Sequence, residues 1–151
     1  MIKKILAAID GSDHAWKALD LATELAKAHG AQLIVLHVVD YEPMPEALRT
    51  YAAVEGMPSE EEAARFRYSR TLGDSLTRDA ESRVRAAGLA AVEARTAEGK
   101  PASVIVETAE AERADMIVMG SRGVSEPRAL ILGSTSHKVA HLAPCTCVTV
   151  K

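Results

Sequence analysis

The chain has few aromatic residues, and this shortage limits how its core is built. Aromatics make up 3% of the 151 residues, with one tryptophan, one phenylalanine and three tyrosines. The core must therefore come mainly from alanine, valine, isoleucine and leucine, which suits buried parallel strands covered by alanine-rich helices. A chain of 151 residues is about one domain long, and we expect a single domain over residues 1–151.

Cysteine is also scarce, and the apolar runs are short. Two thiols, Cys145 and Cys147, cannot form a disulfide framework. No stretch approaches the ~20 apolar residues that a membrane-spanning helix needs. The apolar run that begins at Met1 is interrupted by Asp10, where the apolar part of a secretion signal would continue. These absences predict a soluble, reduced, cytoplasmic protein with no membrane partner.

An excess of charge of one sign is missing as well. The formal net charge is -3 at pH 7, and basic and acidic residues are mixed along the chain. Proteins that mainly neutralise nucleic-acid phosphates are basic, so we expect no nucleic-acid partner.

Apolar runs alternate with amphipathic segments along the chain. We predict strands at residues 2–9, 31–39, 89–97, 115–119 and 145–150. We predict helices from Ser12 or Asp13 to 29, then at 59–87, 101–113 and 134–142. A loop with prolines and glycine spans 40–60, with a helical turn within 45–54, and another loop runs to Leu132. This alternation predicts the α/β class, an open parallel sheet with helices on both faces.

In such sheets, ligands bind beyond the carboxyl ends of the strands, where the strand order reverses. That rule selects Asp10, residues 38–40 and the segment from Gly120 onward. The third place is the richest in glycine and hydroxyl groups.

The segment after the fourth strand has the composition of a phosphate site. Gly120-x2-Gly123 is followed after nine residues by Gly133 and by three hydroxyl residues that open a helix, namely Ser134, Thr135 and Ser136. Glycines let backbone N–H groups approach an anion, and a helix N-terminus favours negative charge. The alternative is a glycine turn followed by an ordinary serine N-cap.

The motif Gly120-x2-Gly123-x9-Gly133-Ser134 resembles the nucleotide-binding signature of the universal stress protein family. Residues 5–12, 36–40, 114–123 and 132–140 are similar to that family too, and the resemblance runs in order from Ile2 to Val150. It implies a Rossmann-like, adenine nucleotide α-hydrolase-like sheet of five parallel strands in the order 3-2-1-4-5. Some members bind ATP and others lack these glycines; this chain keeps them and resembles the ATP-binding members.

The resemblance also implies roles for individual residues around an adenine nucleotide. Asp10 would contact the ribose or a phosphate-bound Mg²⁺, and Val38 would meet the adenine through its backbone. The remaining implied cofactor-binding residues line the pocket or surround the ribose and phosphates: Ala8, Met119, Gly120, Arg122, Gly123, Gly133, Ser134, Thr135 and Ser136. Asp10 also has a simpler interpretation, because an acidic residue before Gly-Ser is a common turn-and-cap element.

Other polar residues indicate less. His37 is expected to be packed at the end of a strand, and His137 and His141 have the spacing of zinc ligands without a third partner. The thiols of Cys145 and Cys147 should lie on one face of a strand as small packing groups, with a redox or metal role as the alternative.

No catalytic residue can be named, because the Walker A loop, the Gly-x-Ser-x-Gly elbow and the His-Glu-x-x-His motif are all absent. Whether the protein is an enzyme stays open, and any ATP hydrolysis should be slow or need a partner. The leading hypothesis is a nucleotide-dependent sensor or regulator. The alternatives are a phosphohydrolase or phosphotransferase with Asp10 holding Mg²⁺, and an interaction module whose glycine loop is empty.

The last strand lies at a sheet edge in the implied order, with only Lys151 to discourage pairing. Two copies joined antiparallel along this edge would form a homodimer, which the resemblance also implies.

Overall fold

A computed structural model describes residues 1–41, 45–55, 59–124 and 133–151, without the side chains of Arg49, Ala52 and Ser59. The predicted loop segments at 42–44 and 56–58, and the loop that ends at Leu132, lie outside these ranges.

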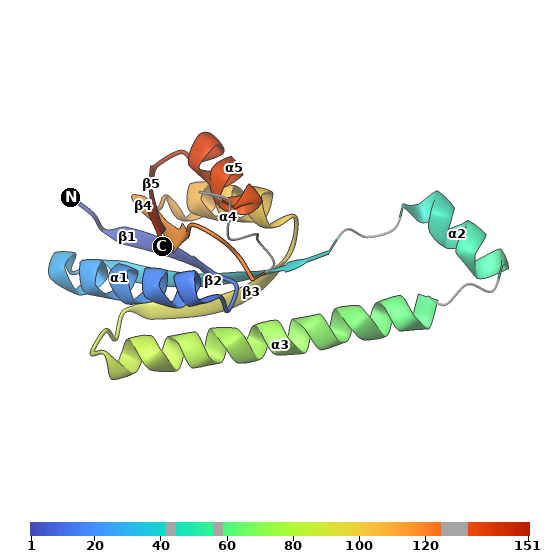
Figure 1. Ribbon diagram of the computed structural model, residues 1–151, viewed down its shortest axis with the longest axis horizontal. Helices are drawn as coiled ribbons and strands as arrows, with labels where there is room; N and C mark the ends of the chain where they lie inside the picture. The colour runs from blue at the N-terminus through green and yellow to red at the C-terminus, as the bar shows by residue number, and fades with distance from the viewer. Residues whose placement is uncertain (42–44, 56–58, 125–132) are drawn as a thin grey trace.

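Five strands and five helices follow one another in the described part of the chain (Figure 1). The strands are β1 (Lys4–Ile9), β2 (Gln32–Asp40), β3 (Val92–Gly99), β4 (Met116–Gly120) and β5 (Thr146–Val150). The helices are α1 (Asp13–His29), α2 (Glu46–Val54), α3 (Ser59–Ala86), α4 (Pro101–Glu112) and α5 (Ser134–Leu142). The strands pair in parallel in the order β3-β2-β1-β4-β5, which confirms the predicted α/β sheet.

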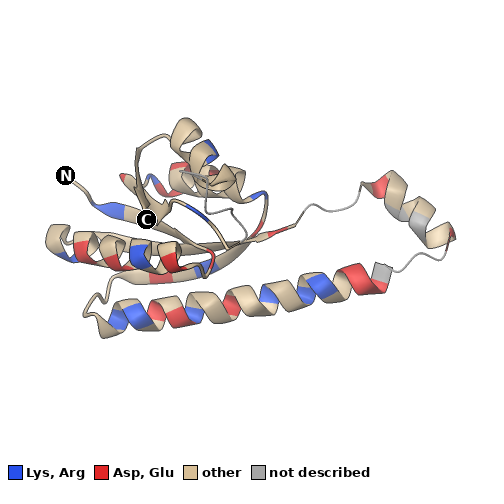
Figure 2. Cartoon of the chain, viewed as in Figure 1, with Lys and Arg blue, Asp and Glu red and all other residues tan. Residues whose placement is uncertain are grey.

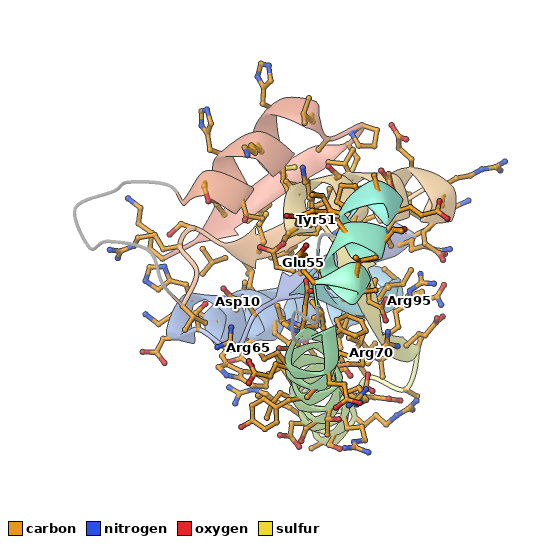
Figure 3. All side chains as sticks on the ribbon, turned by 90° about the vertical axis from the view of Figure 1, so that its right-hand side faces the viewer. Asp10, Tyr51, Glu55, Arg65, Arg70 and Arg95 are labelled. Atoms are coloured by element: carbon orange, nitrogen blue, oxygen red, sulfur yellow. The ribbon has the colours of Figure 1, made fainter. Side chains whose placement is uncertain are left out.

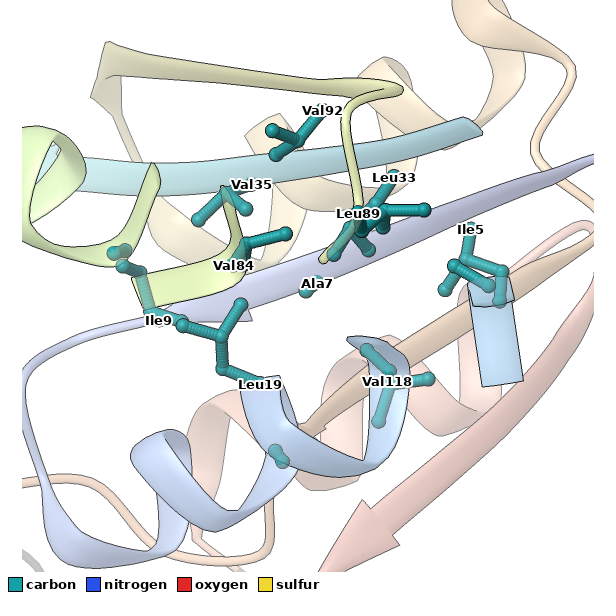
Figure 4. Packing of buried hydrophobic residues seen from close by; sticks show 14 of the residues in the cluster. Ile5, Ala7, Ile9, Leu19, Leu33, Val35, Val84, Leu89, Val92 and Val118 are labelled. Carbon is teal, nitrogen blue, oxygen red and sulfur yellow. The ribbon is translucent and has the colours of Figure 1, made fainter. Parts of the chain in front are cut away.

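Alternate residues of the central strands supply two apolar layers, one on each face of the sheet. In β1, Ile5 and Ile9 join the layer packed against α1 and α3, whereas Leu6 joins the layer packed against α4 and α5. Figure 4 shows the first layer, where Leu19 of α1 and Val84 of α3 meet the strands. The helices cover both faces, as Figure 1 shows, and the small aliphatic side chains fill the core as predicted.

Helix α1 begins and ends where the sequence predicts. The Ser12 hydroxyl accepts a hydrogen bond from the backbone N–H of Ala15, as an N-cap does. Gly30 closes the helix in the left-handed conformation, with φ of 63°. Trp16 on this helix is half-buried against the core, and the guanidinium of Arg83 from α3 lies 5.5 Å from its ring centroid.

The third strand begins at Val92, three residues after the predicted start at Leu89. Helix α3 ends in a Schellman motif, in which Gly88 has φ of 90° and the Leu89 N–H donates to the carbonyl of Val84. Leu89 is the apolar residue that follows such a motif, and it is buried. In the sequence, an apolar residue at this place looks like the first residue of the strand, and the predicted start is therefore too early. β4 begins at Met116, one residue after the predicted start at Asp115, whose side-chain carboxylate accepts the backbone N–H groups of Lys3 and Lys4.

The predicted helical turn after the second strand is the complete helix α2, which begins after Pro45. It lies beside the start of α3, away from the sheet (Figure 1). None of the helices in the described part of the chain is long and apolar enough to cross a membrane.

Candidate functional site

A cavity of about 140 Å³ opens at the carboxyl ends of β1, β2 and β4. It stands where the strand order reverses, between β1 and β4. Every residue predicted for the site except Ser134 lines it: Ala8, Asp10, Val38, Met119, Gly120, Arg122, Gly123, Gly133, Thr135 and Ser136. The fold therefore brings together residues that are up to 128 positions apart in the sequence.

The cavity has an apolar wall that sequence reasoning found only in part. Ala8, Val38 and Met119 were predicted, and Leu36 and Ile105 join them. Ile105 is the fifth residue of α4, and Pro101, the first residue of α4, also lines the cavity. α4 follows the edge strand β3 and begins at the same end of the sheet as the cavity. That position in the chain order could have indicated Pro101 and Ile105 from the sequence. The wall suits a flat apolar group rather than a charged one.

Gly120 is required by the packing of the site. A Cβ atom at Gly120 would lie 2.9 Å from the backbone nitrogen of Ala15 and 2.9 Å from the Cβ of His14. The first turn of α1 therefore rests directly on the end of β4, and any side chain at this position would push the two apart.

Asp10 fixes the loops on either side of the cavity. Its Oδ1 accepts hydrogen bonds from the Ser12 backbone N–H at 3.0 Å and from the Ser12 hydroxyl at 2.6 Å. Its Oδ2 accepts the backbone N–H of Val124 at 3.2 Å, which ties the end of β1 to the segment after β4. The turn-and-cap interpretation of Asp10 is thus present in the structure. Each carboxylate oxygen has about two lone pairs, so Oδ2 keeps the capacity to bind a further group.

Ser121 connects the site to the end of the sheet, and sequence reasoning missed it. Its side chain is fully buried. Its backbone N–H donates to the carbonyl of Val150 at 2.7 Å, and its own carbonyl accepts the N–H of Gly133 at 2.6 Å. The Ser121 hydroxyl lies 3.0 Å from Nδ1 of His14, another residue that was not predicted. These contacts hold together the end of β5, the start of α5 and the start of α1.

The three predicted hydroxyl residues of α5 differ in what they contact. Ser136 is buried, and its hydroxyl donates to the carbonyl of Ser121 at 2.8 Å, with the Gly133 carbonyl at 3.1 Å. Its hydroxyl therefore links Ser121 to Gly133, while Thr135 lines the cavity and Ser134 is exposed. Gly133 has no side chain to cap α5, so the N-terminal end of this helix faces the cavity with its backbone.

A second, more open hollow of about 370 Å³ adjoins the cavity and shares Arg122 and Gly123 with it. The first turn of α1 forms its other side. The Arg122 guanidinium lies 3.5 Å from Nε2 of His14 at the boundary between the two spaces. A ligand in the cavity therefore has room to extend past Arg122 toward the start of α1.

The remaining polar residues of the sequence analysis lie elsewhere. His37 is packed as predicted, with its Nδ1 2.9 Å from the carbonyl oxygen of Ile9. His137 and His141 are exposed on α5, and the described residues hold no group of three or more His, Cys, Asp or Glu side chains that could bind a metal. The side chains of Cys145 and Cys147 both pack on the α4–α5 side of the sheet, and burial raises the pKa of each thiol. A raised pKa keeps the thiols protonated at neutral pH and suits a packing role.

The chain belongs to the universal stress protein family, whose model matches residues 1–151. It is 42% identical to a universal stress protein of Thermus aquaticus over 154 aligned residues, covering 100% of both chains. It is similar in structure to the universal stress protein UspA from Lactobacillus plantarum, with a TM-score of 0.81, 25% identity, and 99% and 98% of the two chains covered. It also resembles a universal stress protein solved in complex with cAMP, with a TM-score of 0.71, 26% identity, and 99% and 97% coverage.

Proposed function

We propose that this protein binds an adenine nucleotide, with ATP as its ligand, in the cavity between β1 and β4. The observation that carries the proposal is the division of the cavity into an apolar wall and a glycine-flanked helix N-terminus. An adenine ring needs the first, and phosphates need the second. The relative solved with cAMP, at 26% identity, supports the same class of ligand.

In the proposed arrangement, the base lies against Val38 and Ala8, and the ribose lies near Met119 and Asp10. The phosphates lie over the loop that holds Arg122 and Gly123 and reach the backbone of α5 at Gly133, Ser134 and Thr135, with Ser136 bracing the loop from behind. The adjoining hollow beside His14 leaves space for a triphosphate.

Mg²⁺ fits this arrangement only as a companion of the nucleotide. It binds protein through one or two carboxylates and completes its shell with water and phosphate oxygens. Asp10 is the carboxylate among the cavity-lining residues that the structure describes, and its Oδ2 retains acceptor capacity. When bound, Mg²⁺ would neutralise phosphate charge, and Asp10 would position it.

The site favours a sensor or regulator over a fast enzyme. Among the described cavity-lining residues, Asp10 is the side chain suited to act as a general base, and both of its oxygens already accept hydrogen bonds from the loops. Nucleotide binding would change the arrangement of the segments around Asp10 and Ser121, and a partner protein would recognise the changed surface. We also propose that two copies join through β5, which occupies the edge of the sheet.

Calorimetric titration of nucleotide-free protein with ATP, with and without Mg²⁺, tests the proposal. We expect micromolar binding, and we expect Gly133→Val to lose it because a branched side chain blocks the approach of phosphate to α5. Thr135→Val gives a milder second variant if Gly133→Val folds poorly. Ala140→Val serves as the matched control, because it adds a branched side chain at an exposed position of the same helix that does not line the cavity.

The outcomes separate the three hypotheses. Equal affinity in Gly133→Val and wild type would remove the nucleotide from the glycine loop. Absence of binding to wild type would favour an interaction module with an empty loop. Rapid release of phosphate that Asp10→Ala abolishes would favour the phosphohydrolase.

A further inference from the structure

The first half of α3 leaves the body of the protein and exposes nearly all of its surface. Its described residues from Glu60 to Leu72 are exposed except Phe66 and Arg70, which are half-buried. Figure 1 shows this end of the helix projecting past the sheet. Isolated helices of this length are marginal in water, so a long helical extension of this kind is stabilised when another surface covers it.

From Phe66 onward, one face of α3 is turned toward the body. Phe66 contacts the ring of Tyr41 at a centroid distance of 4.3 Å. Further along, Gly73, Ala80 and Val84 are buried on the same side of the helix. These positions repeat at about 3.6 residues per turn, so they share one face.

The opposite face points away from the body, and we call it the outer face of α3. It consists of Glu60, Glu61, Ala64, Arg67, Tyr68 and Thr71, all of them exposed. Figure 3 looks toward the end of α3 and shows Arg65 and Arg70 leaving the helix on opposite sides. Phe66 packs on Tyr41, and Arg70 forms an ion pair with Glu98 of β3, so pairing of the outer face with another helix would leave both contacts with the body in place.

The charges of the outer face change sign along the helix. Glu60 and Glu61 stand before Ala64, and Arg67 stands after it. Figure 2 shows the acidic end of α3 followed by a basic band. A surface with this order of charges is complementary to its own copy when the two helices run in opposite directions.

We propose that the outer face of α3 pairs antiparallel with the same face of a second copy of this chain, with Ala64 on the two-fold axis. Glu60 and Arg67 lie on the same flank of Ala64, four residues before it and three residues after it, so each Glu60 meets Arg67 of the other copy. Glu61 and Tyr68 lie on the other flank and come opposite each other in the same way. Ala64 at the axis has a small side chain, which lets the two helix backbones approach closely.

This contact is distinct from the β5 edge and independent of nucleotide binding. One short helix pair is a small interface, so its affinity is weak and depends on concentration. Two symmetric ion pairs on an exposed surface also make it sensitive to salt. The contact would therefore join preformed units at high concentration and low salt.

Sedimentation velocity over a range of concentrations tests the charge pairing in full-length protein. Glu60→Arg and Arg67→Glu should each weaken the association at least about tenfold, because like charges then face each other twice. The double variant Glu60→Arg/Arg67→Glu restores opposite charges and should restore the association. Glu62→Arg is the matched control, because it makes the same charge change on the opposite side of the helix.

A cysteine placed at the axis tests the geometry. Ala64→Cys should form a disulfide-linked dimer under mild oxidation, because its two copies meet at the axis within the ~7 Å that separates bonded Cα atoms at most. Ser69→Cys, on the far side of the helix, should not form it. Equal cross-linking of the two variants would overturn the proposal, as would a sedimentation profile that Glu60→Arg leaves unchanged. Loss of nucleotide binding in wild type would leave both results as they are.

Discussion

The two halves of α3 belong to one continuous helix but have opposite surroundings. In the second half, Ala80 and Val84 are buried against the sheet, with exposed fractions of 0% and 1%. In the first half, Tyr68 and Leu72 keep 67% and 52% of their surface exposed. Gly73 stands at the boundary, as the first described residue of α3 that is buried, and it packs against His37 of β2 and Thr96 of β3.

This difference shows that helix formation and helix packing have separate causes in this chain. The first half is rich in alanine, glutamate and arginine, which favour the helical state without tertiary contacts. The second half adds buried residues at the spacing of one helix face, and that spacing fixes the helix to the sheet. One end of α3 is therefore part of the core, and the other end is an exposed surface.

The largest expected effect contrasts one apolar residue from each half. Val84→Ala removes two buried methyl groups and should lower the free energy of unfolding by about 1.5–3 kcal/mol. Leu72→Ala should change it by less than about 0.5 kcal/mol. Urea unfolding at low protein concentration, where copies are apart, measures both. Similar losses in the two variants would mean that the first half is packed against the body after all.

A smaller effect is expected at the boundary. A Cβ at Gly73 would lie 2.7 Å from Cδ2 of His37 and 3.1 Å from Cγ2 of Thr96. The His37 ring is held by the carbonyl of Ile9, so it yields little. Gly73→Ala should therefore lower the free energy of unfolding by about 1 kcal/mol, because overpacking outweighs the better helix propensity of alanine.

Ser69→Ala is the control for this change, since it places alanine in the exposed half of the same helix. It should leave stability unchanged or raise it slightly. A gain in Gly73→Ala equal to that in Ser69→Ala would show that α3 stands further from β2 and β3 than the structure places it. Thermal unfolding followed by circular dichroism distinguishes the two results.

The smallest expected effect comes from acid, which should act on the body rather than on the projecting half. Hydrogen bonds from the backbone N–H groups of Lys3 and Lys4 lower the pKa of Asp115. A carboxylate with a lowered folded-state pKa stabilises the protein above its unfolded-state pKa of about 4, and that contribution disappears as the pH falls through the folded-state value. Asp115→Asn should therefore be less stable than wild type at pH 7, and the two should converge in strong acid.

Urea unfolding at a series of pH values measures that convergence. Glu61→Gln, on the exposed half of α3, should follow the wild-type curve at protein concentrations where the copies are separate. A difference between wild type and Asp115→Asn that persists in strong acid would show that the asparagine acts through packing and not through the lost charge.

The sheet could be predicted because each strand carries its own signal. The apolar runs that became β1 and β2 are buried on both faces, and such runs are hard to assign to anything but central strands. The start of β3 could not be predicted, because Leu89 is apolar for a different reason: it covers the end of α3. Local sequence does not separate these two causes of burial.

The sequence indicates the residues that lie at strand ends and glycines around the cavity, but it does not indicate the side-chain contacts that the fold makes between distant residues. Gly120 and Gly133 stand out in the sequence, and both line the cavity. The contact of His14 with Ser121 joins residues 107 positions apart, and neither belongs to a motif that the sequence displays. Ser136 illustrates the same limit, because only the fold shows that its hydroxyl is directed to the Ser121 carbonyl.

The bond from the Ser121 N–H to the carbonyl of Val150 has a practical consequence for handling the protein. Val150 is next to Lys151, so an affinity tag fused to Lys151 would disturb the end of β5. The Val150 carbonyl accepts the Ser121 N–H, and the Ser121 carbonyl accepts the Gly133 N–H, so the disturbance would reach the cavity. Met1 is 98% exposed and lies at the other end of β1 from the cavity. Purification tags and fluorescent labels therefore belong on the amino terminus when ligand affinity is to be measured.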